Sequence, residues 1–189
     1  TLVAVPLSIQ TNQTKVVIGD QTWMNENLSV DHFRNGDPIP EAKSNEQWER
    51  AGKEGKPAWC YYENNPANEE KYGKLYNWYA VNDPRGLSPY GYHIPSHVEW
   101  TTLINCLGGK AVAGRKMRST GGWKKSGNGN NTSGFTGLPG GGRWTNGKFA
   151  NVGTHSYFWS STRDSANNAW LFGLYYYEIY RSGFSIENG

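Results

Sequence analysis

The sequence predicts a single, loop-rich α+β domain in which short helices pack on small, twisted antiparallel sheets. The 189 residues include 24 glycines, which disfavours a helical bundle because glycine is a poor helix former. Aromatic residues make up 14% of the chain, so rings must supply much of the buried area. Short strand-like segments separated by turn residues favour small sheets. No internal repeat or linker divides the chain, and we expect one domain over residues 15–189 after an N-terminal extension or linker over 1–14.

Five short elements are expected in the first half of the chain. Gly19-Asp20 separates two strand segments, which is typical of a β-hairpin. Ser44 and Gln47 have the spacing of a capping box, which marks the start of a helix. A later helix ends before Pro84, because the residue before a proline avoids helical backbone. The expected elements are strands over 16–18, 21–24 and 59–62, and helices over 44–51 and 75–81.

The most clearly marked helix begins after Ser96. Ser96 is the expected N-cap and Glu99 is its reciprocal partner at the third helical position. Gly108-Gly109 supplies the end of the helix. We expect the helix to pack against the core through one face, because apolar residues recur at the spacing of a single stripe. They are Trp100, Leu103, Ile104 and Leu107.

The second half of the chain is expected to contain mainly loops and strands. Residues 121–131 are rich in glycine, asparagine and lysine, which predicts a surface loop. Residues 145–148 suit a hairpin turn. The remaining expected elements are a short helix over 111–118 and strands over 157–161 and 169–176. In these last strands we expect Trp159 and Trp170 to lie in the core.

The charge pattern argues against a nucleic-acid partner. The formal net charge is only +3, and basic residues occur beside acidic ones, as in Lys53-Glu54 and Glu70-Lys71. One basic cluster, Arg115 to Arg118 with Lys124-Lys125, is either a solvated face or a site for a polyanion such as a sulfated glycan. No segment is long and apolar enough to span a membrane. The first residues lack the charged start of a signal peptide, so we expect a mature or excised piece.

The two cysteines leave two interpretations open. Cys60 and Cys106 do not have the spacing of a metal site. They would form a disulfide in an oxidising compartment, or both would be small buried hydrophobic residues.

Five motifs occur in order along almost the whole chain. They are residues 17–28 (VIGDQTWMNENL), 72–81 (YGKLYNWYAV), 91–96 (GYHIPS) leading to Trp100, 134–141 (GFTGLPGG), and Trp159-Ser160-Ser161-Thr162 with Ala169-Trp170. Together they make the chain resemble the Fibrobacter succinogenes major paralogous domain family.

That resemblance implies a C-type-lectin-like fold and a location outside the cell. Members are expected to be secreted or outer-surface proteins of Bacteroidota-like bacteria, often lipoproteins or appended modules. The chain has Ser88 where members often carry a cysteine, and it stops at Gly189 where a final strand should begin. We therefore expect the domain to lack its last strand.

The sequence offers little support for catalysis or for a resident cofactor. The four histidines are scattered, and no set of them has a metal-like spacing. Formylglycine-generating enzymes resemble the segment around Trp100, but their reactive cysteine pair late in the chain is missing here. A calcium ion is the one cofactor kept open, because oxygen ligands occur in three turn-like segments. These are Asn82-Asp83, Glu63 to Asn65, and Asp164 with Asn167-Asn168.

We expect a non-catalytic, extracellular or outer-membrane-surface recognition module that is a monomer and binds a polysaccharide or other glycan. Tyrosine and arginine on strands give large contact area for little entropy lost. The alternative function is that of a surface adhesin or structural protein that binds a protein partner. If the tyrosines contact no ligand, we expect them to pack against the missing strand. The chain also resembles the variable receptors of diversity-generating retroelements, in which the diversified residues after the matching Ala-Trp face solvent. By that resemblance and by proximity, the expected ligand contacts are Trp144, His155, Leu171, Tyr175, Tyr176, Glu178, Tyr180 and Arg181.

Overall fold

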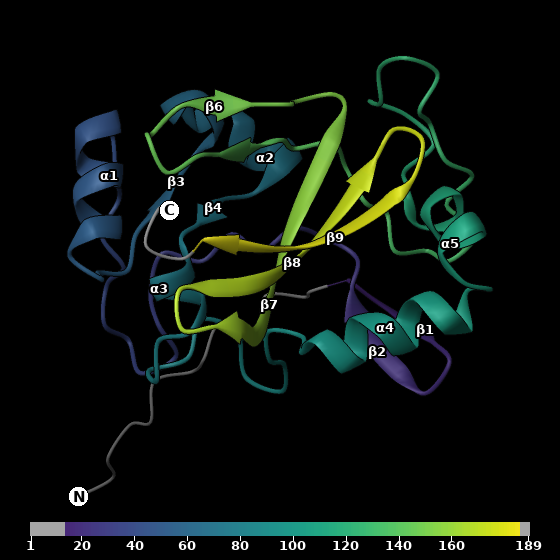
Figure 1. The fold of residues 1–189 in the computed structure, drawn as a ribbon, viewed down its shortest axis with the longest axis horizontal. Helices are drawn as coiled ribbons and strands as arrows, with labels where there is room; N and C mark the ends of the chain where they lie inside the picture. The colour runs from purple at the N-terminus through teal and green to yellow at the C-terminus, as the bar shows by residue number, and fades with distance from the viewer. Residues whose placement is uncertain (1–13, 186–189) are drawn as a thin grey trace, which may run out of the picture.

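The computed structural model describes residues 14–185 and shows short helices packed with small antiparallel sheets (Figure 1). The predicted α+β class is thereby confirmed. The helices are α1 (Asn45–Lys53), α2 (Glu69–Tyr72), α3 (Trp78–Val81), α4 (His97–Cys106) and α5 (Lys110–Met117), with 3-10 turns η1 (Tyr62–Asn64) and η2 (Pro66–Asn68). The strands are β1 (Lys15–Ile18), β2 (Gln21–Met24), β3 (Trp59–Cys60), β4 (Leu75–Tyr76), β5 (Gly142–Arg143), β6 (Phe149–Ala150), β7 (His155–Ser165), β8 (Asn168–Tyr175) and β9 (Ile179–Ser185). Most of the expected N-terminal extension, and the expected missing strand, lie outside the described residues.

The largest sheet joins β7, β8 and β9 in that order, with both pairs antiparallel. It crosses the middle of the molecule in Figure 1, with α4, α5 and the β1–β2 hairpin to one side. The helices α1 to α3 and the pairs β3–β4 and β5–β6 lie to the other side. Different elements therefore cover the two sides of the sheet.

The core consists of two main clusters on either side of this sheet. One surrounds Trp100 of α4 and includes Phe172 and Leu174 of β8. The other surrounds Trp78 of α3, which is fully buried, and includes Ala169 of β8. Rings supply much of both clusters, as the composition predicted.

The cap of α4 has the predicted form. The Ser96 hydroxyl accepts a hydrogen bond from the backbone N–H of Glu99, and the Glu99 carboxylate accepts one from the N–H of Ser96 at 2.7 Å. The predicted stripe is also confirmed, because Trp100, Leu103, Ile104 and Leu107 are all buried. These local signals suffice because they act within one turn of the chain.

The helix predicted over 75–81 is only partly correct. Leu75 and Tyr76 pair with β3, and helical structure begins at Trp78. Asn77 separates the two because it has extended backbone and its side chain caps α3 through the N–H of Ala80. The same Oδ1 atom accepts from Ala58 N at 3.0 Å, while Nδ2 donates to Lys56 O at 2.8 Å.

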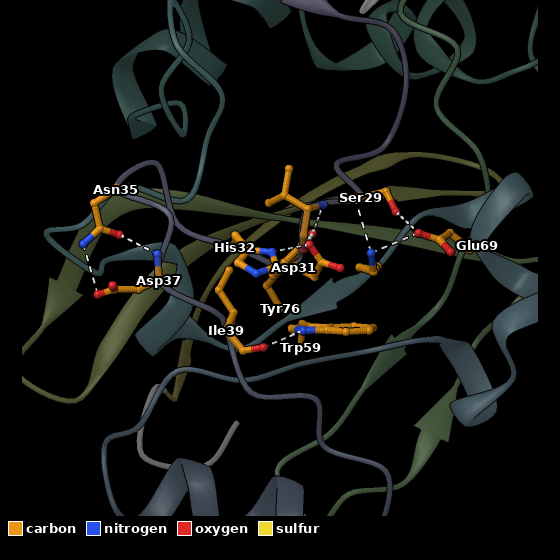
Figure 2. Close-up of polar contacts among 11 residues, drawn as sticks. Ser29, Asp31, His32, Asn35, Asp37, Ile39, Trp59, Glu69 and Tyr76 are labelled. Atoms are coloured by element: carbon orange, nitrogen blue, oxygen red, sulfur yellow. Dashed lines mark hydrogen bonds and ion pairs between the residues drawn. The ribbon is translucent and has the colours of Figure 1, made fainter. Parts of the chain in front are cut away.

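The segment between β2 and α1 has little regular structure and is held by side-chain hydrogen bonds, which Figure 2 shows. The Tyr76 hydroxyl lies 2.7 Å from both the N–H and the carbonyl oxygen of Val30. The Trp59 indole donates to Ile39 O at 2.8 Å. This loop is therefore fixed against β3 and β4.

The loop over 121–131 is present as predicted, but it is not wholly a surface segment. Trp123 is buried in the core cluster around Trp100. Its indole donates to Gly137 O and to the Ser119 hydroxyl, both at 3.1 Å. Spacing could not reveal this because the tryptophan is isolated in a polar segment.

Candidate binding face on the C-terminal sheet

One face of the β7–β9 sheet carries a group of aromatic side chains near the start of β7. Alternation along the strands places His155 and Tyr157 on this face, because successive side chains point to opposite sides. His155 is paired with Tyr175, and Tyr157 is paired with Gly173. Gly173 is in turn paired with Tyr180 of β9. Three strands thus bring their rings to one region.

These rings form a continuous row, which we call the aromatic band. Tyr175 stacks on Tyr180 at 5.3 Å between ring centroids with an interplanar angle of 15°. Tyr175 also lies 6.2 Å from Tyr157, which in turn lies 5.5 Å from Trp144. Neighbouring centroids in protein interiors have the same separations, so the rings support one another. The aromatic band consists of Trp144, His155, Tyr157, Tyr175, Tyr177 and Tyr180.

The band is accessible at its β9 end and half-buried at its β7 end. Tyr177 and Tyr180 are 60% and 43% exposed, whereas Trp144 and Tyr157 are half-buried. His155 lies in the middle, 4.1 Å from the Tyr175 ring and nearly parallel to Tyr157. Aromatic rings that are partly exposed and held by neighbours can contact a ligand at low entropic cost.

The band carries no net charge of its own at neutral pH. Burial raises the pKa of the Tyr175 hydroxyl, and the neighbouring Tyr157 raises it further. Burial lowers the pKa of His155, and the positive charge of Lys125 lowers it further. Tyr175 is therefore protonated and His155 is neutral near pH 7. The chemistry available is ring stacking and neutral hydrogen bonding.

Four of the predicted contact residues belong to the band: Trp144, His155, Tyr175 and Tyr180. Tyr176 lies beside it, 4.6 Å from Tyr177, with Lys125 Nζ 5.0 Å from its centroid. Glu178 is exposed on the same β8–β9 connection. The backbone of Arg181 is in β9, but its side chain lies outside the described residues.

Leu171 corrects the prediction, because it is buried and cannot face a partner. It lies opposite Trp159, at the end of the sheet that the α3 cluster covers. Trp159 packs there on Trp78 at 5.7 Å and donates to Tyr76 O at 3.0 Å. The same face is therefore open at one end and covered at the other.

Two band residues, Tyr157 and Tyr177, were not among the predicted contacts. Alternation could have found Tyr157, which is two residues from His155 in the same strand. No sequence signal marks Tyr177, because it lies in the turn after β8 where alternation stops.

A cavity of about 220 Å³ adjoins the β7 end of the band and is lined by both Trp144 and Tyr157. Its lining includes Lys74 and Arg143 but neither aspartate nor glutamate. Arg143 is buried between the rings of Trp48 and Phe149. The cavity therefore has a buried guanidinium beside the rings.

Both cations have structural partners. Lys74 Nζ lies 3.0 Å from a Glu69 carboxylate oxygen, which also accepts from Ser29 (Figure 2). The Arg143 guanidinium donates to the carbonyl oxygens of Gly147 and Ala42 at 2.9 Å. These bonds fix where the positive charges lie relative to the rings.

The histidines and cysteines do not converge. Across residues 14–185 no three His, Cys, Asp or Glu side chains form a group that could hold a metal ion. His32 pairs with Asp31 at 2.7 Å and His93 pairs with Glu99 at 2.6 Å, in separate places. Cys60 is buried, Cys106 is exposed, and both are free thiols, so the disulfide alternative is not realised.

Residues proposed above as calcium ligands are engaged in local bonds. Both carboxylate oxygens of Asp83 accept from the Arg85 guanidinium at 2.8 Å. Asn65 accepts from the N–H of Ala67, as turn asparagines commonly do. These contacts give the asparagine and the aspartate a role in holding turns.

The described residues form an α+β fold with an aromatic band on its largest sheet. The chain belongs to the Fibrobacter succinogenes major domain family, whose model matches residues 16–186. The family expected from the motifs is thereby confirmed. No curated protein and no solved structure matches the chain. Within the described part of the chain, none of the helices is both long and apolar enough to cross a membrane.

Proposed function

We propose that the domain is a non-catalytic recognition module that binds a polysaccharide or other glycan outside the cell, with a fold of the C-type-lectin-like type. The observation that carries the proposal is the aromatic band, in which rings from three strands form one row. Sugar rings present flat C–H faces that pack on aromatic faces, and their hydroxyls bond to tyrosine hydroxyls.

The cavity beside Trp144 and Tyr157 favours a glycan over a flat protein partner. A ligand lying along the band can place one substituent in this hollow, where Arg143 supplies a positive charge and the charge of Lys74 is paired with Glu69. A carboxylate or sulfate group would suit that environment better than an ammonium group. The band itself is uncharged, so the sugar backbone can be neutral or acidic.

Affinity electrophoresis against a panel of neutral, uronate and sulfated polysaccharides tests the proposal. We expect at least one polymer class to retard the domain, and Tyr180→Ala to reduce the retardation strongly. Tyr90→Ala is the matched control, because Tyr90 is 75% exposed and its ring contacts Arg34 rather than the band. Retardation that is equal in both variants would place the glycan elsewhere.

The panel also separates the other possibilities. Loss of retardation with chelator would show that calcium takes part. If no polymer retards the domain, the proposal is wrong and the band is better explained as a surface for a protein partner.

A further inference from the structure

A second cavity bordered by the described residues lies away from the aromatic band. Its volume is about 400 Å³, and it lies between the end of β2 with residues 25–28 and the segment 91–95 that leads into α4. The Gln21 side chain crosses this boundary and donates to Glu99 O at 3.2 Å. Figure 1 shows β2 and α4 adjacent on the side of the sheet that holds the Trp100 cluster. No residue of the aromatic band lines this cavity.

Several residues of the lining have buried polar atoms without a hydrogen-bond partner among the described residues. The donors are the indole N–H groups of Trp23 and Trp100, whose residues are 7% and 3% exposed. The acceptors are Gln21 Oε1 and Asn25 Oδ1. Leaving a buried polar group unpaired costs about 1–3 kcal/mol, so a concentration of such atoms at one cavity requires an explanation.

The lining is mainly acidic. Among the described residues it contains the carboxylates of Asp20, Glu26 and Glu99 and the imidazole of His93, which pairs with Glu99, but neither lysine nor arginine. Burial raises the pKa of Glu99, but hydrogen bonds from Ser96 and His93 outweigh it and hold the pKa below its ordinary value. Glu99 is therefore ionised near neutral pH, and an anionic ligand would be repelled.

An aromatic cluster forms part of the remaining wall. Trp23 lies 4.8 Å from Trp100, and Phe135 lies within 6.0 Å of both rings. Ligand sites commonly combine such a wall with a few convergent polar groups, and they have volumes of about 300–1,000 Å³. The cavity meets both conditions.

We infer that this cavity binds a polyhydroxylated, non-anionic ligand of about the size of one sugar ring. Hydroxyl groups both donate and accept, so one ligand can serve the unpaired indole donors and the unpaired amide acceptors. Carboxylates accept strongly from hydroxyls, and the rings can pack on the C–H face of the ligand. The site differs from the aromatic band in place and in charge, so it does not depend on glycan binding there.

The test uses the whole chain and three ligands of nearly equal shape: glucose, glucuronate and glucosamine. Ligand-observed NMR titration, extended to galactose and mannose, measures each dissociation constant. We expect at least one neutral hexose to bind saturably, and its uronate to bind at least about tenfold more weakly because of the three carboxylates. Because the same carboxylates attract an ammonium group, glucosamine should bind at least as tightly as glucose. Equal binding of hexose and uronate, or no binding by any hexose, would overturn the inference.

Glu26→Gln is the diagnostic variant, because Glu26 is exposed and its contact with Thr14 is peripheral. We expect it to weaken hexose binding about tenfold, since a hydrogen bond to a charged acceptor becomes a neutral one. It should also reduce the discrimination against uronate. Glu70→Gln is the matched control, because Glu70 is exposed and lines neither cavity, and it should leave hexose binding unchanged. Unchanged hexose and uronate affinities in a folded Glu26→Gln domain would contradict the assignment.

Discussion

The ring of Tyr175 lies across Gly173, so close that a Cβ atom at position 173 would come within 2.7 Å of it. Gly173 is the β8 residue paired with both Tyr157 and Tyr180. The Tyr175 ring thus occupies the space that a side chain at 173 would fill. Its position there makes the aromatic band continuous from β7 to β9.

Gly173→Ala is therefore expected to displace the Tyr175 ring and interrupt the band. Its backbone does not require glycine, since Gly173 lacks a positive φ, so the effect should come from the ring contact. We expect weaker polysaccharide retardation and a loss of about 1–3 kcal/mol in unfolding free energy from overpacking. Gly121→Ala, where nothing lies within 4 Å, should change neither property. Unaltered retardation by Gly173→Ala would show that the Tyr175 position is unimportant for binding.

Leu171 and Tyr180 should respond to alanine in opposite ways. Leu171 is buried, so its truncation should lower the free energy of unfolding by about 2–5 kcal/mol. Tyr180 is 43% exposed at the edge of the band, and its truncation should change stability far less. Urea denaturation of both variants measures the difference. Comparable losses would mean that Tyr180 is a core residue rather than a contact residue.

Asn77 is expected to be the polar residue on which the junction of β4 and α3 depends. It is fully buried, and its amide bonds Ala58, Ala80 and Lys56. Asn77→Ala would leave buried backbone groups unpaired and should cost about 3 kcal/mol in unfolding free energy. Asn35, which is exposed and bonds only within its own turn (Figure 2), supplies the control, and Asn35→Ala should stay within about 0.5 kcal/mol.

His155 should make the domain less stable as the pH falls. Its pKa is lowered from 6.5 in the folded protein by burial and by Lys125, so folding favours the neutral ring. The stabilisation is complete above the unfolded pKa and is lost as the pH falls through the folded pKa. The difference in unfolding free energy between the wild type and His155→Gln should therefore shrink between about pH 7.5 and pH 5. A pH-independent difference would contradict this role.

The two thiols should differ in reactivity. Burial raises the pKa of Cys60 to about 11, whereas Cys106 is exposed. A thiolate-selective reagent at pH 8 should label one thiol in the native protein and both after denaturation. Cys106→Ser should abolish the native labelling. Rapid labelling of both thiols without denaturant would show that the cluster around Cys60 opens readily.

The sequence by itself determined the features that depend on neighbouring residues. The Ser96–Glu99 cap and the β1–β2 hairpin arise within a few residues, and the ordered motifs identified the family. Alternation also placed Tyr175 on a strand, whereas His155 was expected in a neighbouring loop and instead begins β7. These signals are local, so no knowledge of packing was needed.

Only the tertiary structure decided which residues on one face of β8 are covered by other elements and which remain accessible. Leu171 and Tyr175 lie on the same face of β8, yet the Trp78 cluster covers the first and leaves the second in the band. The tertiary structure also decided that Leu75 and Tyr76 form a strand, because hydrogen bonding to β3 is favoured there over helix formation. The acidic cavity likewise joins Gln21 and Glu99, which are far apart in the chain. Burial and cavities depend on which distant segments meet, and that information is not present in local spacing.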